Sequence, residues 1–108
     1  VHANHFKTPG ALARVLGRSL ETTPDSLYRD RRVSEFLLAR AGQLDEEEVI
    51  EALSDRFGAP RAVCRAPSAG PGGAPSAAVA TLVFDPAARK MRIAPTPFQE
   101  HIYTEYSL

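Results

Sequence analysis

Residues 78–94 read Ala-Val-Ala-Thr-Leu-Val-Phe-Asp-Pro-Ala-Ala-Arg-Lys-Met-Arg-Ile-Ala, and they predict a pair of antiparallel strands. The first part, Ala78 to Phe84, is mostly apolar and favours a largely buried strand. Asp85 to Arg89 predicts a turn, because aspartate and proline favour turn geometry. Lys90 to Ala94 is then the returning strand.

The segments on either side extend this pattern. Pro95, Thr96 and Pro97 interrupt it, and residues 101–107 alternate again as expected for a final strand. On the other side, residues 66–76 are rich in proline, glycine and serine, which predicts a flexible surface loop. We therefore expect three antiparallel strands after this loop.

A first helix is predicted ahead of the loop, from about Ser26 to Ala41. Asp25 or Ser26 can cap its start, and Gly42 is a typical helix terminator. Its apolar residues recur at helical spacing and predict a buried stripe. That stripe consists of Leu27, Val33, Phe36 and Leu37, together with Arg40.

A second helix is predicted after Leu44. Asp45 followed by Glu48 is a capping-box pattern, in which each side chain bonds the backbone N–H of the other residue. Gly58 and Pro60 are expected to end the helix. Its predicted buried stripe consists of Val49, Ile50, Leu53 and Phe57.

The fold class follows from the order of these elements. Val1 to Phe6 alternates in side-chain character and predicts a short strand before the Thr8-Pro9-Gly10 breaker, whereas residues 11–23 are ambiguous. The order strand, two helices and three strands is α+β. At 108 residues the chain is the size of one domain.

The composition excludes several classes of function. Lysine plus arginine and aspartate plus glutamate both number 13, so the net charge is zero and a nucleic-acid partner is not expected. No apolar run approaches the length that crosses a bilayer, so no membrane partner is expected either. The single cysteine, Cys64, cannot form an internal disulfide, which favours the reducing cytoplasm.

The opening residues suggest that the chain was cut from a longer protein. Val1 to Phe6 has no initiator methionine and reads as the middle of a strand, whereas the termini of complete domains are usually polar. A start codon read literally as valine is the alternative explanation.

Histidine and cysteine are the first candidates for chemistry. His2, His5 and His101 do not have the spacing of a zinc site, and no second cysteine completes one, so we expect no metal and no cofactor. Cys64 could meet a histidine in space as a nucleophilic pair. A small buried hydrophobic residue is the favoured interpretation of Cys64.

Polar residues elsewhere have both structural and functional interpretations. Asn4 is either an edge or turn residue that bonds the backbone, or an amide N–H directed at a developing oxyanion. The run from Asp45 to Glu48 favours a helix start over a cation site. The arginines of the first helix favour a solvated face paired with nearby acids. These arginines are Arg29, Arg31 and Arg32, and the acids are Asp25, Asp30 and Glu35.

Taken together, several segments resemble the isopenicillin N acyltransferase-like family, which includes acyl-CoA:6-aminopenicillanic acid acyltransferase. His2-Ala3-Asn4-His5-Phe6 is similar to the family's His-Thr-Asn-His-Phe segment. Further matching segments follow in the family's order over nearly the whole chain. They are Ser26 with Arg29 and Arg32, Leu53-Ser54-Asp55, Pro60 to Arg65, Ala80 to Pro86, Pro95 and the ending from Tyr103 to Leu108.

The resemblance implies a cysteine-type N-terminal-nucleophile hydrolase with a four-layered αββα fold, of which residues 1–108 are the carboxy-terminal part. It implies a precursor that cuts itself to expose an amino-terminal cysteine, which attacks an amide or thioester carbonyl. Asn4 matches the asparagine that helps to hold the oxyanion, and Arg65 matches an arginine near the nucleophile. The implied substrates are small-molecule amides or acyl-CoA.

The sequence departs from the family where the nucleophile is concerned. It begins with Val1 and Cys64 is not at the nucleophile position, so the chain is expected to supply supporting residues to an upstream half of the same protein. Alone, it should expose sheet edges, which a dimer or a complementing chain would cover. Two alternatives remain: a non-catalytic α+β interaction domain or degenerate paralogue, and a stand-alone hydrolase that uses Cys64.

Overall fold

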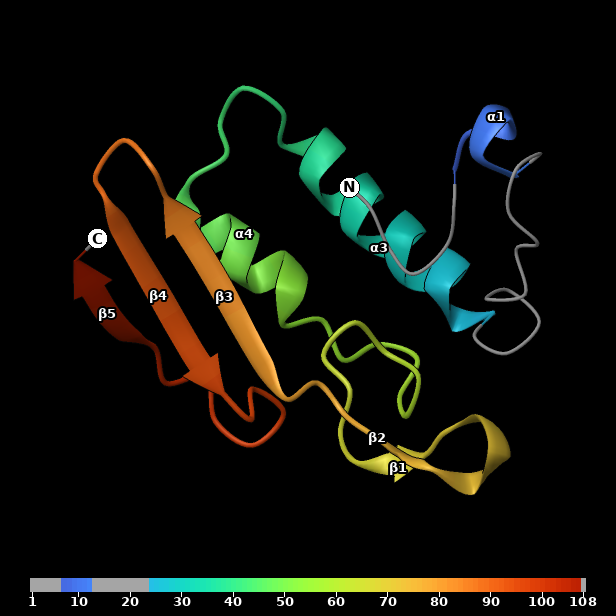
Figure 1. Ribbon diagram of the computed structural model, residues 1–108. Coiled ribbons are helices and arrows are strands. Elements are labelled where there is room, and N and C mark those ends of the chain that lie inside the picture. Colours follow the sequence, from blue (N-terminus) through green and yellow to red (C-terminus); the bar gives the residue numbers. More distant parts are fainter. Residues whose placement is uncertain (1–6, 13–23, 108) are drawn as a thin grey trace.

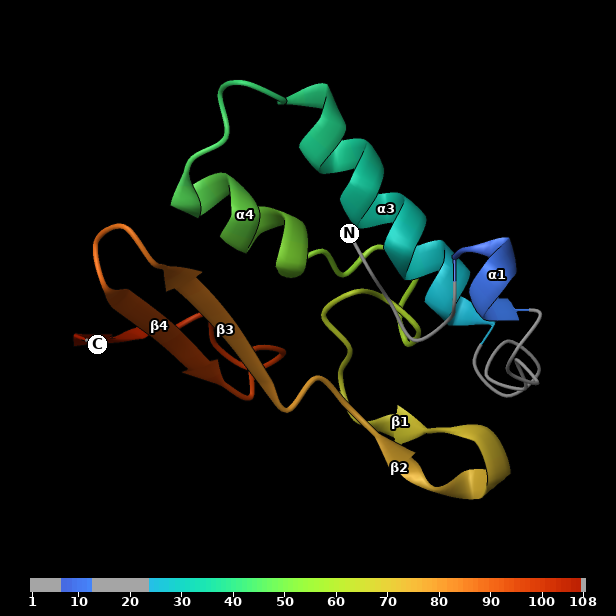
Figure 2. The same ribbon diagram turned by 45° about the horizontal axis from the view of Figure 1, so that its top comes forward.

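The computed structural model describes residues 7–12 and 24–107, and the strand predicted at Val1 to Phe6 lies outside them. The chain is α+β, with two main helices and two antiparallel sheets. Helix α4 lies beside the larger sheet, and α3 packs on α4 farther from the sheet (Figures 1 and 2). No helix in these residues is both long and apolar enough to cross a membrane.

Helix α1 (Pro9–Leu12) is a single turn that begins in the predicted breaker and ends in the segment whose prediction was ambiguous. Proline is compatible with the first position of a helix, because its missing N–H would have no partner there and its φ angle is already helical. The Thr8-Pro9-Gly10 segment therefore begins a short helix.

Helix α3 (Asp25–Ala39) confirms the predicted first helix to within two residues at each end. Val33 lies in the core as expected, whereas Leu27 is exposed, so its place in the predicted stripe was wrong. The buried line of this helix starts at Ser26, which is fully buried, and reaches Val33 seven residues later. Leu27 is one position further round the helix, about 100° away from that line.

Helix α4 (Glu46–Leu53) begins with the predicted capping box. The Asp45 carboxylate accepts a hydrogen bond from the Glu48 backbone N–H at 2.9 Å, and the Glu48 carboxylate accepts one from the Asp45 N–H at 3.1 Å. Its end was predicted too late, because the helix stops at Leu53 rather than near Gly58. Phe57 is consequently exposed instead of buried, and its ring lies against the Arg32 guanidinium.

The three predicted strands form one antiparallel sheet in the order β3 (Ala80–Asp85), β4 (Lys90–Pro95) and β5 (Thr104–Ser107). The register places Leu82 opposite Ile93 and Phe84 opposite Met91. The proline- and glycine-rich loop contains a small hairpin that the sequence did not predict. It consists of β1 (Ser68–Ala69), the 3₁₀ turn η1 (Pro71–Gly73) and β2 (Pro75–Ser76).

The two faces of the large sheet differ. Arg92 of β4 bonds Glu47 at 2.8 Å and pairs with Glu46 at 3.2 Å, so the face that carries Arg92 lies under α4. Ala94, two residues along β4, is on this face and fully buried. The other face carries exposed apolar side chains. No described helix or strand lies against that face of the sheet (Figure 2). The strand predicted to be largely buried at Ala78 to Phe84 is therefore covered on one face only.

Candidate functional site

Of the two site residues predicted from the family resemblance, Asn4 lies outside the described residues and Arg65 lies within them. Arg65 is in the connector between α4 and β1. The backbone on either side of its side chain is fixed, because the Cys64 N–H donates to the Asp55 carbonyl and the Ala78 N–H donates to the Arg65 carbonyl, both at 2.9 Å. The connector therefore holds Arg65 between the helices and the strand region.

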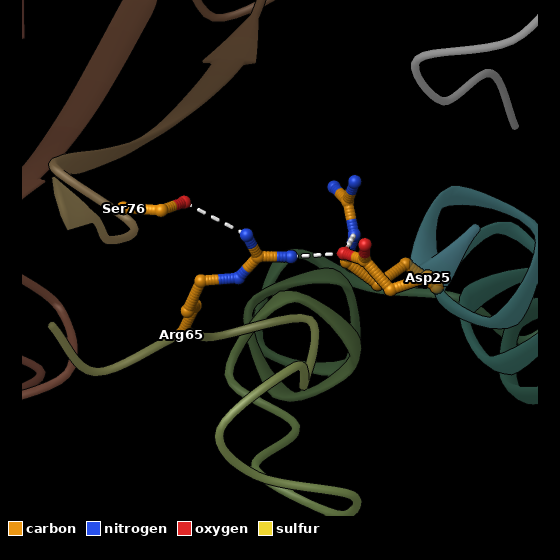
Figure 3. A network of polar contacts seen from close by, with 4 residues as sticks. Asp25, Arg65 and Ser76 are labelled. Carbon is orange, nitrogen blue, oxygen red and sulfur yellow. Dashed lines mark hydrogen bonds and ion pairs between the residues drawn. The ribbon is translucent and has the colours of Figure 1, made fainter. Parts of the chain in front are cut away.

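The Arg65 guanidinium is held at two points. One terminal amino group donates to Asp25 Oδ2 in an ion pair, and the other donates to Ser76 Oγ at 2.8 Å (Figure 3). Asp25 is the first residue of α3, and Ser76 is the last residue of β2. A single side chain thus joins the first turn of α3 to the hairpin formed by β1 and β2.

Asp25 has a second cationic partner. Arg29 Nε donates to the same carboxylate oxygen at 3.2 Å, as the helical spacing predicted. The side chains of Asp25 and Arg65 are only 9% and 13% exposed, so water screens their charges weakly. Two guanidinium groups share one carboxylate, so the described members of this network carry one net positive charge. A fixed and partly buried positive charge of this kind favours a neighbouring anion.

The other two arginines of α3 have different partners. Arg31 pairs with Glu35 at 2.7 Å, which confirms the predicted pairing along the helix. Arg32 was predicted to have a partner on its own helix, but it donates to Asp55 beyond the end of α4, also at 2.7 Å. This bond holds the pKa of Asp55 below its ordinary value. Arg32 thus helps to fasten α3 to the segment that follows α4.

A second polar cluster joins the end of α4 to the loop between β4 and β5. Ser54 Oγ lies 3.0 Å from His101 Nδ1, and a terminal amino group of Arg56 lies 3.3 Å from His101 Nε2. The same group of Arg56 donates to the carbonyl oxygen of Phe98 at 2.6 Å. This cluster was not predicted from the sequence, because no local pattern connects residues that are about 45 positions apart.

The partners of His101 determine which of its nitrogens carries the proton. Arginine offers only donors, so His101 Nε2 is the acceptor of the contact with Arg56. The neutral ring then has its proton on Nδ1 and donates it to Ser54 Oγ. Activation of a serine requires the opposite arrangement, in which the histidine accepts the serine proton. These contacts join the loop to the end of α4, and with Nε2 as the acceptor His101 has the tautomer opposite to the one that would activate Ser54.

Cys64 is 3% exposed, which confirms the prediction of a small buried residue. Burial raises the pKa of its thiol, and the nearby Arg56 offsets only part of that rise. Arg65 is adjacent in the sequence, but its guanidinium is held by Asp25 and Ser76. Because the thiolate is the reactive form of cysteine, this environment is unfavourable for a nucleophile.

Two hollows lie among the described residues, and both are smaller than a typical ligand site. One, of about 120 Å³, lies between the helices and is lined in part by Phe36, Ala52 and Asp55. Another, of about 270 Å³, lies beside Thr96 and Ile102. Sites for small molecules usually occupy about 300–1,000 Å³. No group of three or more potential metal ligands occurs in residues 7–12 and 24–107.

Comparison of the chain with protein-family models, with curated proteins and with solved structures gave no match. The similarity to the acyltransferase-like family therefore rests on the sequence segments quoted above.

The burial of Cys64 predicts slow chemical modification. Iodoacetamide at neutral pH should alkylate Cys64 in the folded chain at least about 10-fold more slowly than in the urea-unfolded chain, since burial limits both access and ionisation. Mass spectrometry of the alkylated chain measures both rates, and Cys64→Ala provides the blank. Equal rates in the two states would contradict the buried environment of Cys64 and would favour the alternative hypothesis of a hydrolase that uses Cys64.

Proposed function

We propose that this chain is the carboxy-terminal part of a cysteine-type N-terminal-nucleophile acyltransferase or amide hydrolase. It supplies supporting residues, and an upstream half of the same protein supplies the nucleophile. The ordered sequence segments support the choice of family. The distribution of apolar side chains in the described residues supports the view that a further layer of structure packs on this chain.

The uncovered face of the large sheet is the observation that carries the proposal. Leu82, Phe84 and Tyr106 are 46%, 56% and 48% exposed. The register places Met91 directly opposite Phe84 and next to Tyr106, so these side chains share one face. Contiguous exposed apolar surface on a sheet marks a contact with another structural layer or another protein.

The interior of the described region, in contrast, is built mainly from small residues. Ala52, Ala62, Cys64 and Ala94 are buried, whereas large apolar side chains such as Phe84 are exposed. A self-contained domain normally places its largest apolar side chains inside. A second sheet packed about 10 Å from the uncovered face would bury them, as in a sandwich with helices outside both sheets.

In the proposed enzyme the chain contributes electrostatic groups to the site. Asn4 supplies an amide N–H to the oxyanion that forms when the cysteine attacks an amide or thioester carbonyl. Arg65 supplies a fixed positive charge near the nucleophile, and its two bonds to Asp25 and Ser76 suit that role. The substrate class is a small-molecule amide or an acyl-CoA thioester.

A non-catalytic interaction domain is the second candidate, and the same uncovered face favours it. In that case Leu82 and Phe84 would pack on a separate protein instead of on an upstream half of the same protein. The two candidates differ in one respect: only the enzyme requires a longer native chain with an amino-terminal cysteine.

The native protein should be a processed, longer chain. Intact mass and amino-terminal sequencing of the protein from its natural source should give a chain that begins with cysteine and ends with these residues. The reason is that an amino-terminal nucleophile is its own general base through its α-amine. A native chain that begins at Val1, or at a methionine in its place, would overturn the enzyme and favour the interaction domain.

If a second sheet packs on the uncovered face, Phe84→Ala should have different effects in the complete protein and in the isolated chain. Phe84→Ala should cost about 3–5 kcal/mol of unfolding free energy in the complete protein, where a second sheet covers the side chain. In the isolated chain it should cost about 1 kcal/mol or less, because Phe84 is half exposed there and loses mainly its cross-strand contacts. Urea denaturation measures both values.

The matched control for that comparison is Leu38→Ala, since Leu38 is an exposed apolar residue of α3. It lies in the helical layer, which a second sheet would not touch, and should have a small effect in both proteins. If Phe84→Ala were as mild as Leu38→Ala in the complete protein, the proposed αββα architecture would be wrong.

The oxyanion role of Asn4 has a kinetic consequence. Asn4→Ala in the complete enzyme should raise the activation barrier by about 2.7–4 kcal/mol, because one oxyanion donor is lost. The loss should fall on kcat more than on KM, since the donor acts when negative charge develops. A rate measured with a thioester or amide substrate that stays at the wild-type level would remove Asn4 from the site.

A further inference from the structure

We infer that Asp25 is a positioning residue that holds the Arg65 guanidinium in the orientation that it needs beside the nucleophile. The inference rests on the proposed function, because it takes Arg65 to be the charge near the nucleophile. It goes beyond the family resemblance, in which Asp25 has no assigned role. The geometry that carries it is the ion pair between Asp25 Oδ2 and Arg65, together with the bond from Arg65 to Ser76.

Two contacts on different sides are enough to fix a planar guanidinium. Asp25 accepts from one terminal amino group of Arg65, and Ser76 accepts from the other, so neither end of the group is left to rotate (Figure 3). Arginine has five N–H donors in a rigid fork, so donors remain for an anion. Asp25 and Ser76 therefore orient Arg65 and leave some of its N–H donors available to an anion.

The surroundings of this ion pair distinguish it from a surface pair on the same helix. Asp25 and Arg65 are 9% and 13% exposed, whereas the side chains of Arg31 and Glu35 are 80% and 59% exposed. An exposed pair contributes little and holds neither side chain in place. A mostly buried pair is weakly screened, and loss of one partner leaves the other free to move or in need of a new partner.

Charge also separates a positioning role from a purely electrostatic one. The Asp25 carboxylate is negative, so its charge alone opposes ionisation of a neighbouring thiol. Arg65 is positive and promotes that ionisation. Replacement of Asp25 by a neutral residue therefore has opposite effects in the two cases. It eases thiolate formation if only the charge matters, and it hinders thiolate formation if Arg65 is displaced.

The test uses the complete processed protein and iodoacetamide, with the alkylation rate of its amino-terminal cysteine measured from pH 5 to pH 10. Arg65→Gln should raise the midpoint of the pH–rate profile by about 1 unit or more, since an opposite charge close to the thiolate is lost. Asp25→Asn should also raise it. In the Arg65→Gln background, Asp25→Asn should give no further rise, because Asp25 acts through Arg65.

Two further variants control for folding and for charge. Ser76→Ala removes the second bond to Arg65 without changing any charge, and it should raise the midpoint by a smaller amount. This variant keeps the test decisive if Asp25→Asn does not fold. Glu35→Gln breaks the exposed pair on the same helix and should leave the midpoint unchanged. Thermal unfolding of each variant separates misfolding from misorientation of Arg65.

The outcomes distinguish this inference from the function on which it rests. An unchanged or lower midpoint in Asp25→Asn, with the rise in Arg65→Gln present, overturns the positioning role and leaves the function standing. An unchanged midpoint in Arg65→Gln removes Arg65 from the nucleophile's surroundings and overturns the inference as well. A native protein without an amino-terminal cysteine overturns both the inference and the proposed function.

Discussion

The carboxylate of Asp25 connects parts of the chain that are remote in sequence. Asp25 is the first residue of α3, and its carboxylate forms ion pairs with Arg29 of the same helix and with Arg65 of the connector beyond α4. Through Arg65 and Ser76 it also reaches the hairpin of β1 and β2, and the backbone of the Arg65 segment bonds Ala78 just before β3. Because a mostly buried charge pair is costly to break, this contact limits how far the helices can move relative to the segment that leads into the sheet.

The sheet depends on the helices in a different way. Arg92 reaches from β4 to the acidic start of α4, where Glu46 and Glu47 also favour the positive end of the helix. Ala94 is fully buried on the same face as Arg92, and its small side chain allows a close approach to the sheet at that point. Large apolar side chains lie on the opposite face, and a further layer of structure packed there would bury them.

Local patterns predicted much of this fold, and contacts between distant segments set the remainder. The capping box at Asp45 and the turn from Asp85 to Arg89 involve neighbouring residues, so the sequence identified them. The end of α4 was missed, because Phe57 has the right spacing for a longer helix although the helix stops at Leu53. For the site, the resemblance indicated Arg65, but its partner Asp25 is 40 positions away and no spacing rule could find it.

In the proposed enzyme, the positive charge around Arg65 and the uncovered sheet face would have one common explanation. Two arginines share one carboxylate at Asp25, and a partly buried excess charge is tolerable when an anionic group can approach it. An exposed apolar face around Phe84 is tolerable when another layer covers it. A single upstream half that brings both a thiolate and a second sheet would satisfy the two requirements together.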